Sequence, residues 1–173
     1  MDNTPFAVAI AYEGKKTLVI VQEILNPLNR VFRVKFPDGK TIEINTYEPE
    51  EDNQSGWAID AEESQLAKEI GSAIDEKEFK GGRFYIEPFA TRVNDKDYLI
   101  MPEYQEADEE RVPGVAGYDE LFLNYAIYED GHFRFYLQKD EHWIADVKGI
   151  YMHVDEALVE KLGNFIEEHY QLA

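Results

Sequence analysis

Alternating apolar and polar positions near the N-terminus predict two β-hairpins. Apolar residues alternate with alanine over residues 6–11, and the β-branched run 17–21 returns after a turn that contains glycine. A second alternating run, 31–36, leads into Pro37-Asp38-Gly39-Lys40 and the returning segment 41–44. The basic residues of the run 31–36 fall opposite its apolar residues, so we expect one face of this sheet to meet water.

A four-residue apolar period predicts a helix in the middle of the chain. Leu66, Ile70 and Ile74 form one apolar stripe. Asp60 is placed to cap the N-terminus of this helix, and Gly81 is placed to end it. We therefore expect a single amphipathic helix with its stripe against the sheet.

The second half of the chain predicts further strands and a second helix. The expected strands are 84–93, 98–101, 121–128, 133–137, 143–147 and 150–153. The helix begins at Asp155 and carries Leu158, Leu162 and Ile166 on one stripe. Residues 46–56 and 102–119 have the composition of loops.

Two pairs of segments in the chain resemble one another. LAKEIGSAIDE, from Leu66, and LVEKLGNFIEE, from Leu158, place leucine, glycine, isoleucine and two acidic residues at the same spacing. VFRVKF, from Val31, resembles HFRFYL, from His132, which implies a longer loop around residues 48–53 in the first copy. We interpret these matches as an internal duplication of a β-hairpin/β-hairpin/helix unit. The alternative is that two amphipathic helices resemble each other by chance.

The repeated glycines, Gly71 and Gly163, lie in the middle of the predicted helices. Glycine inside a helix costs about 1 kcal/mol relative to alanine. We therefore expect close packing at these positions, against a sheet or against the other helix.

The pattern as a whole predicts an α+β fold, mainly an antiparallel β-sheet of about ten strands with two α-helices. The first ββββα unit would cover residues 1–80, and a second, elaborated unit residues 81–173. Each half is close to the size at which a core becomes marginal, so we expect the halves to pack together as one globular domain.

Composition narrows the classes of function. The 173 residues contain no cysteine, which excludes disulfides, thiolate metal sites and cysteine nucleophiles. The N-terminus lacks the basic segment of a signal peptide, and no apolar run approaches the roughly 20 residues that span a bilayer. We expect a cytoplasmic protein without membrane contact.

The charge balance is strongly acidic. Seventeen basic residues against 36 acidic ones give a formal net charge of −19. Such a surface disfavours direct binding to nucleic acids and anionic membranes and suits a basic protein partner. The simpler alternative is that the acidity serves solubility.

Motifs for catalysis or for binding of metals and cofactors are absent from the sequence. The three serines lack the context of a nucleophile elbow, and the four histidines form no closely spaced pair. The glycine pairs lie outside the strand-to-helix context that a phosphate cradle requires. We expect no cofactor and favour a non-enzymatic protein, with an active site formed from non-contiguous residues left open.

Aromatic residues are concentrated in the second half, where residues 81–173 hold 16 of the 23. Tyrosine is favoured at protein interfaces because it joins a large apolar ring to a polar tip. The candidate interaction surface consists of Tyr104, Tyr118, Tyr125, Tyr128, Tyr136, Glu106, Asp108, Glu109 and Glu110.

These observations favour a protein-interaction or regulatory module that binds a basic partner through an acidic, tyrosine-rich face. The alternative is a small-molecule binding protein with an aromatic pocket between the two units, and an enzyme is the least favoured class. The oligomeric state is left open.

Overall fold

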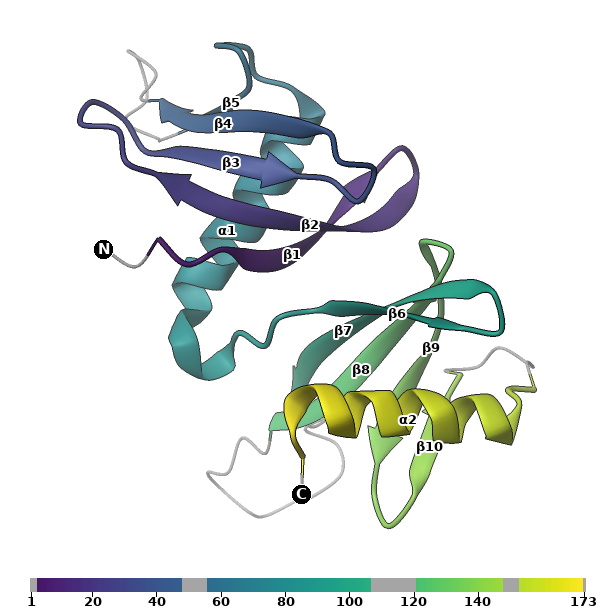
Figure 1. The fold of residues 1–173 in the computed structure, drawn as a ribbon. Coiled ribbons are helices and arrows are strands. Elements are labelled where there is room, and N and C mark those ends of the chain that lie inside the picture. Colours follow the sequence, from purple (N-terminus) through teal and green to yellow (C-terminus); the bar gives the residue numbers. More distant parts are fainter. Residues whose placement is uncertain (1–2, 48–55, 107–120, 148–152, 173) are drawn as a thin grey trace. The chain divides into compact units, whose positions relative to one another are not determined.

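The fold consists of two antiparallel sheets, each with one helix (Figure 1). A computed structural model describes residues 3–47, 56–106, 121–147 and 153–172. Within these residues there are ten strands and two helices, which confirms the predicted α+β class. Contacts divide the chain into two compact units, Met1–Phe89 and Ala90–Ala173.

The first unit is a meander of five strands, each antiparallel to the next. Its strands are β1 (Phe6–Tyr12), β2 (Lys15–Ile24), β3 (Val31–Lys35), β4 (Thr41–Tyr47) and β5 (Gly56–Ala58). Both predicted hairpins are confirmed. In the first turn, Glu13 and Gly14 have φ values of 50° and 75°, as a tight two-residue hairpin requires.

The prediction of a loop over residues 46–56 is wrong at both ends. Thr46 and Tyr47 close β4, and Gly56 opens β5, which pairs with the end of β4. A strand of three residues is too short to show a period in the sequence. Its hydrogen bonds to β4 define it instead.

Helix α1 (Gln65–Phe84) covers the apolar face of the first sheet. Ala67, Ile70 and Ile74 of the helix are fully buried. They pack on the buried sheet residues Val8, Ile10, Val19, Val21, Phe32, Val34, Phe36 and Ile44. Arg33 and Lys35, on the other face, are exposed, which confirms that this face meets water.

Both predicted ends of α1 are wrong. Ser64 is the N-cap, and its hydroxyl accepts the backbone N–H of Ala67 at 3.1 Å, whereas Asp60 lies in a preceding turn with φ 51°. At the other end the helix continues past Gly81 to Phe84. The terminal residues of helices depend on local capping contacts, which more than one nearby residue can supply.

The segment after α1 is fixed by contacts with β1 rather than by strand pairing. The hydroxyl of Tyr85 donates to the carbonyl oxygen of Ala7 at 2.6 Å, and Glu87 accepts the backbone N–H of Ala7 at 3.1 Å. The strand expected over residues 84–93 therefore begins only at Phe89.

The second unit repeats the five-strand meander. Its strands are β6 (Phe89–Val93), β7 (Lys96–Glu106), β8 (Leu121–Glu129), β9 (His132–Lys139) and β10 (Trp143–Asp146). Strand β7 is longer than predicted, so residues 102–106 are regular strand and not irregular chain. The rest of the segment 102–119, and the expected strand 150–153 up to residue 152, lie outside the described residues.

Helix α2 (Glu156–Tyr170) covers one face of the second sheet (Figure 1). Asp155 caps it, accepting the backbone N–H of Ala157 at 3.0 Å, which confirms the predicted start. The helix buries Val159, Leu162, Gly163 and Ile166.

The two units share the order of five strands and one helix, which suggests a duplication. The predicted strand match is wrong in detail, because VFRVKF is the third strand of its unit and HFRFYL is the fourth. The turns give the correspondence: Gly39 and Gly131, each after a third strand, lie 92 positions apart, as do Gly71 and Gly163. The units differ in their connections. The β4–β5 connection of the first unit is longer than the β9–β10 connection, and the β7–β8 connection is longer than the β2–β3 connection.

Each repeated helix glycine lies under a tryptophan from the last strand of its own sheet. A Cβ atom at Gly71 would collide with the ring of Trp57, and one at Gly163 would collide with the ring of Trp143. The predicted close packing is therefore confirmed, and the partner is the sheet.

The same tryptophans are held by a carboxylate one helical turn beyond the glycine. Trp57 Nε1 donates to Asp75 Oδ2 at 2.9 Å, and Trp143 Nε1 donates to Glu167 Oε1 at 2.9 Å. Each unit thus joins its helix to its last strand by one ring contact and one hydrogen bond.

Candidate functional site

The predicted interaction surface is only partly described. Tyr118, Asp108, Glu109 and Glu110 lie outside the described residues. Glu106 is placed by its backbone pairing with Leu121, where β7 ends and β8 begins. The four remaining tyrosines belong to the second sheet, on strands β7, β8 and β9.

Two of these tyrosines lie on the face that α2 covers. Tyr125 is 4% exposed, and its ring lies 5.6 Å from that of Trp143 and 6.1 Å from that of Tyr170. Burial raises the pKa of Tyr125 above its usual value. Tyr104 belongs to the same face by register and is 38% exposed. Because it is buried beneath α2, Tyr125 is a core residue and not part of an exposed surface.

The other two tyrosines lie on the opposite face of the sheet. Tyr136 of β9 pairs with Ala126 of β8, and Tyr128 follows Ala126 by two residues on the same strand. Both side chains are half-buried. The predicted set of tyrosines therefore divides between the two faces.

Phe133 joins Tyr128 and Tyr136 into a continuous group of rings, named here the ring cluster. The ring centroids of Tyr128 and Phe133 are 5.7 Å apart with planes at 72°, and those of Phe133 and Tyr136 are 4.9 Å apart at 56°. Phe133 is 44% exposed. The three rings, tilted relative to one another, thus form one partly exposed apolar surface.

A β-bulge puts Phe133 on this face. Phe133 pairs with Tyr128 and Phe135 pairs with Ile127, so Arg134 is the extra residue of the bulge on β9. In a regular strand, residues three apart point to opposite faces of the sheet. Without the bulge, Phe133 would therefore lie on the other face from Tyr136. The candidate set drawn from the sequence consisted of tyrosines and acidic residues, so it did not include Phe133. Its only signal was its place in an aromatic-rich hairpin.

Glu103 of β7 places a carboxylate beside the ring cluster. It pairs with Asn124, so it lies on the same face as Ala126 and Tyr136. The hydroxyl of Tyr136 is hydrogen-bonded to Glu103. Burial, and then the negative charge of Glu103, raise the pKa of both Tyr128 and Tyr136 above the usual value.

Two further residues extend this face toward the edge strand. Asp146 of β10 pairs with Tyr136, and its charge also raises the pKa of that tyrosine. Ile144, two residues earlier on the same face, is 53% exposed. The face thus combines rings, an exposed aliphatic side chain and two carboxylates.

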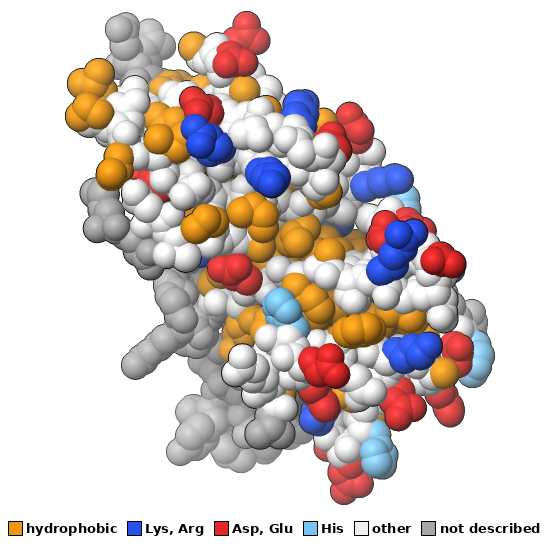
Figure 2. All heavy atoms as spheres, viewed as in Figure 1, with side chains coloured by type: hydrophobic (Ala, Val, Ile, Leu, Met, Phe, Trp, Pro, Cys, Tyr) orange, Lys and Arg blue, Asp and Glu red, His pale blue; other side chains and the backbone are white. Residues whose placement is uncertain are grey.

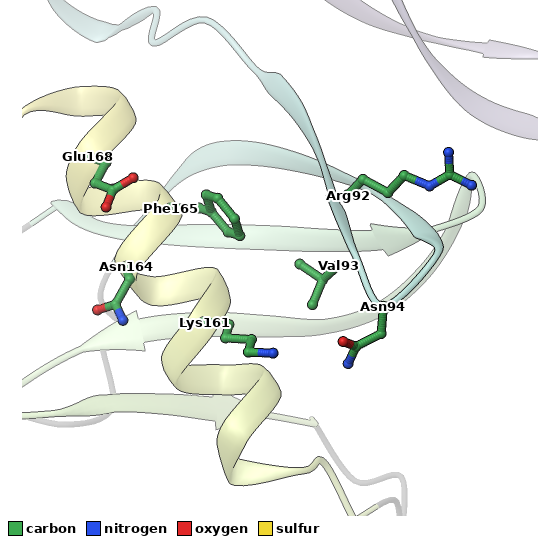
Figure 3. A pocket seen from close by; sticks show the side chains of 7 residues that line it. All are labelled: Arg92, Val93, Asn94, Lys161, Asn164, Phe165 and Glu168. Atoms are coloured by element: carbon green, nitrogen blue, oxygen red, sulfur yellow. The ribbon is translucent and has the colours of Figure 1, made fainter.

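A separate groove of about 340 Å³ lies between α2 and the end of β6 (Figure 3). Phe165 points toward Val93, Lys161 extends toward Asn94, and Arg92 points away from the groove. Phe165 supplies the only ring of the lining. The groove lies within the second unit, so it is not the aromatic pocket between units that the small-molecule alternative requires.

Acidic side chains are spread over both units on the face shown in Figure 2, with basic side chains among them. Within the described residues, no three His, Asp or Glu side chains are grouped as metal ligands. No helix among those residues is long and apolar enough to cross a membrane. Charge alone therefore does not locate a site, and the ring cluster with Glu103 is the candidate that geometry defines.

Comparisons with protein-family models, curated proteins and solved structures give no match.

Proposed function

We propose that the protein is a non-enzymatic interaction module that binds a basic protein through the face of the second sheet opposite α2. The observation that carries the proposal is the ring cluster, partly exposed and bordered by the carboxylate of Glu103. Aromatic rings supply most of the binding energy at many protein interfaces, and adjacent carboxylates select a basic partner.

Comparison of the two sheets supports this choice of face. The face of the first sheet opposite α1 presents charged side chains such as Arg33, Lys35 and Glu43 around one exposed aliphatic residue, Ile20, which is 40% exposed. The corresponding face of the second sheet presents Phe133 and Ile144, 44% and 53% exposed. Exposed apolar side chains grouped on one face mark interaction surfaces.

The net charge of −19 supports a basic partner in particular. A strongly acidic protein attracts cationic proteins and speeds their association, and salt screens this attraction. Small-molecule binding stays a prediction, because the described groove offers a single ring.

Site-specific crosslinking tests the proposal. The photoreactive amino acid p-benzoylphenylalanine replaces Phe133 in one variant and Phe79 in a matched control. Phe79 is a 93% exposed aromatic residue on α1, so both variants replace an exposed ring by an aromatic one. We expect a basic protein to be crosslinked at position 133 and not at 79, with a yield that falls as salt is added.

Three outcomes would contradict the proposal: equal capture at both positions, capture of a partner that is not basic, or a yield that salt leaves unchanged. Circular dichroism of both variants verifies that the exchanged rings leave the fold intact.

A further inference from the structure

We propose that the ring cluster and Glu103 form a binding site for an arginine side chain of the partner, with the guanidinium over the rings and against the carboxylate. This inference rests on the proposed function and names the chemical group that the face recognises.

The geometry of the rings favours a flat cation. The ring of Phe133 is tilted by 72° to that of Tyr128 and by 56° to that of Tyr136, so the cluster presents ring faces in more than one direction. Ring faces carry negative electrostatic potential and attract cations. A planar guanidinium can also stack on a ring, which an ammonium cannot.

Glu103 supplies the matching anion. Its carboxylate lies close enough to both tyrosines to raise the pKa of each, and it is hydrogen-bonded to Tyr136. Ala126, a small and fully buried residue, lies on the strand between Glu103 and Tyr136, so no large side chain separates the two on this face of the sheet. A carboxylate can accept two parallel N–H bonds from one guanidinium, and such charge-assisted pairs are among the strongest in proteins.

The first unit contains the same combination with an arginine of its own. The guanidinium of Arg30 lies 5.0 Å from the ring centroid of Phe32. Its Nε donates to Glu23 at 3.0 Å, and its NH1 donates to Glu78 at 3.1 Å. A ring and nearby carboxylates therefore suffice to hold a guanidinium in this chain.

The occupant is a side chain of a basic protein and not a free metal ion or a nucleic acid. A phosphate backbone would be repelled by Glu103 and Asp146, and apolar rings offer no ligand to a hard cation. The exposed Ile144 at the edge of the face provides an apolar contact for the partner's chain around the arginine.

Peptide binding tests this inference with the full-length protein. The probe is a fluorescein-labelled peptide in which arginine alternates with glycine, and two matched peptides carry lysine or the neutral isostere citrulline in place of arginine. Fluorescence anisotropy at low salt gives the dissociation constants. We expect the arginine peptide to bind about threefold or more tighter than the lysine peptide, and the citrulline peptide to bind weakest.

Variants assign the binding to the cluster. Glu103→Gln should weaken binding of the arginine peptide about tenfold, because a charge-assisted pair is lost. Tyr136→Leu and Phe133→Leu should each weaken it about threefold, because bulk is kept and the ring is lost. Glu141→Gln, at an exposed acid of the β9–β10 connection, makes the same charge change away from the cluster and should have little effect.

Two results would overturn the inference. Equal effects of Glu103→Gln and Glu141→Gln would mean that only overall charge attracts the peptide. Equal affinities for the arginine and lysine peptides would mean that the rings do not select a guanidinium. If either result occurs but a basic protein is still crosslinked at position 133, only the arginine site is overturned and the proposed function stands. If the crosslinking fails, the proposed function itself is overturned. Amide NMR spectra of each variant verify the fold.

Discussion

At the scale of single residues, Glu167 shows how one carboxylate joins three elements. Its Oε1 accepts from Lys139 Nζ of β9 at 2.6 Å and from Trp143 Nε1 of β10 at 2.9 Å, while the residue itself belongs to α2. The ammonium of Lys139, followed by the indole N–H, lowers the pKa of Glu167 below its usual value. A lowered folded-state pKa means that the ionised carboxylate stabilises the fold.

We therefore expect Lys139→Met to raise the pKa of Glu167, measured from the pH dependence of its side-chain carboxyl signal by carbon NMR. The wild type should have a higher free energy of unfolding than Lys139→Met. This difference should be largest above pH 4.5, the ordinary pKa of a glutamate, and should shrink as the pH falls through the lowered pKa of Glu167. Lys161→Met removes the same charge from a residue that lines the groove on α2 and serves as the control. An unchanged Glu167 pKa in Lys139→Met would contradict the assigned cause.

At the scale of secondary-structure elements, each helix packs on its sheet through a glycine of the helix and a tryptophan of the last strand. The rings of Trp57 and Trp143 occupy the space that a side chain at Gly71 or Gly163 would need. Each tryptophan also contacts a ring of its unit's third strand, at 5.6 Å from Phe32 and 5.6 Å from Tyr125. Close approach of helix and sheet therefore depends on glycine in both units.

Gly71→Ala should lower the free energy of unfolding by about 1–3 kcal/mol, because overpacking outweighs the helix propensity gained. Gly163→Ala should behave likewise. The controls Ser72→Ala and Asn164→Ala change exposed neighbours and should be neutral or slightly stabilising. Urea unfolding gives the values.

A double-mutant cycle tests the cause of this effect. In a Trp57→Leu background, Gly71→Ala should cost clearly less, since the colliding ring is gone. Equal costs in both backgrounds would show that the ring is not what requires glycine.

At the scale of the whole molecule, the charge of −19 opposes the compact state. Several described ion pairs, such as Arg33–Glu43 and Arg92–Asp97, have exposed partners and contribute little to stability. Repulsion among the excess carboxylates is therefore the main long-range electrostatic effect.

We expect the melting temperature at pH 7 to rise as NaCl is increased from about 20 mM to about 500 mM, because salt screens this repulsion. Differential scanning calorimetry measures the shift. At pH 4.5, near the sequence pI of about 4.5, the rise should nearly vanish. An equal rise at both pH values would point to a general salt effect on burial of apolar surface.

Local pattern was enough to predict most elements of the fold. The alternation around Phe6 and Phe32 gave the first hairpins, the stripe through Ile70 gave α1, and Asp155 gave the start of α2. Each of these patterns involves only a few neighbouring residues, because the periods of strands and helices and the caps of helices are local properties. The matched Gly71 and Gly163 also predicted close packing.

The sequence by itself thus determined the α+β class, the approximate number of strands and the existence of two similar helices. Only the tertiary structure decided that Trp57 and Trp143 cover those glycines, that Tyr125 is buried while Tyr128 and Tyr136 lie on the other face, and that a bulge brings Phe133 beside them. These features depend on strand register and on contacts between distant segments. A shift of one residue in register reverses the face of every side chain, and a local pattern does not record it.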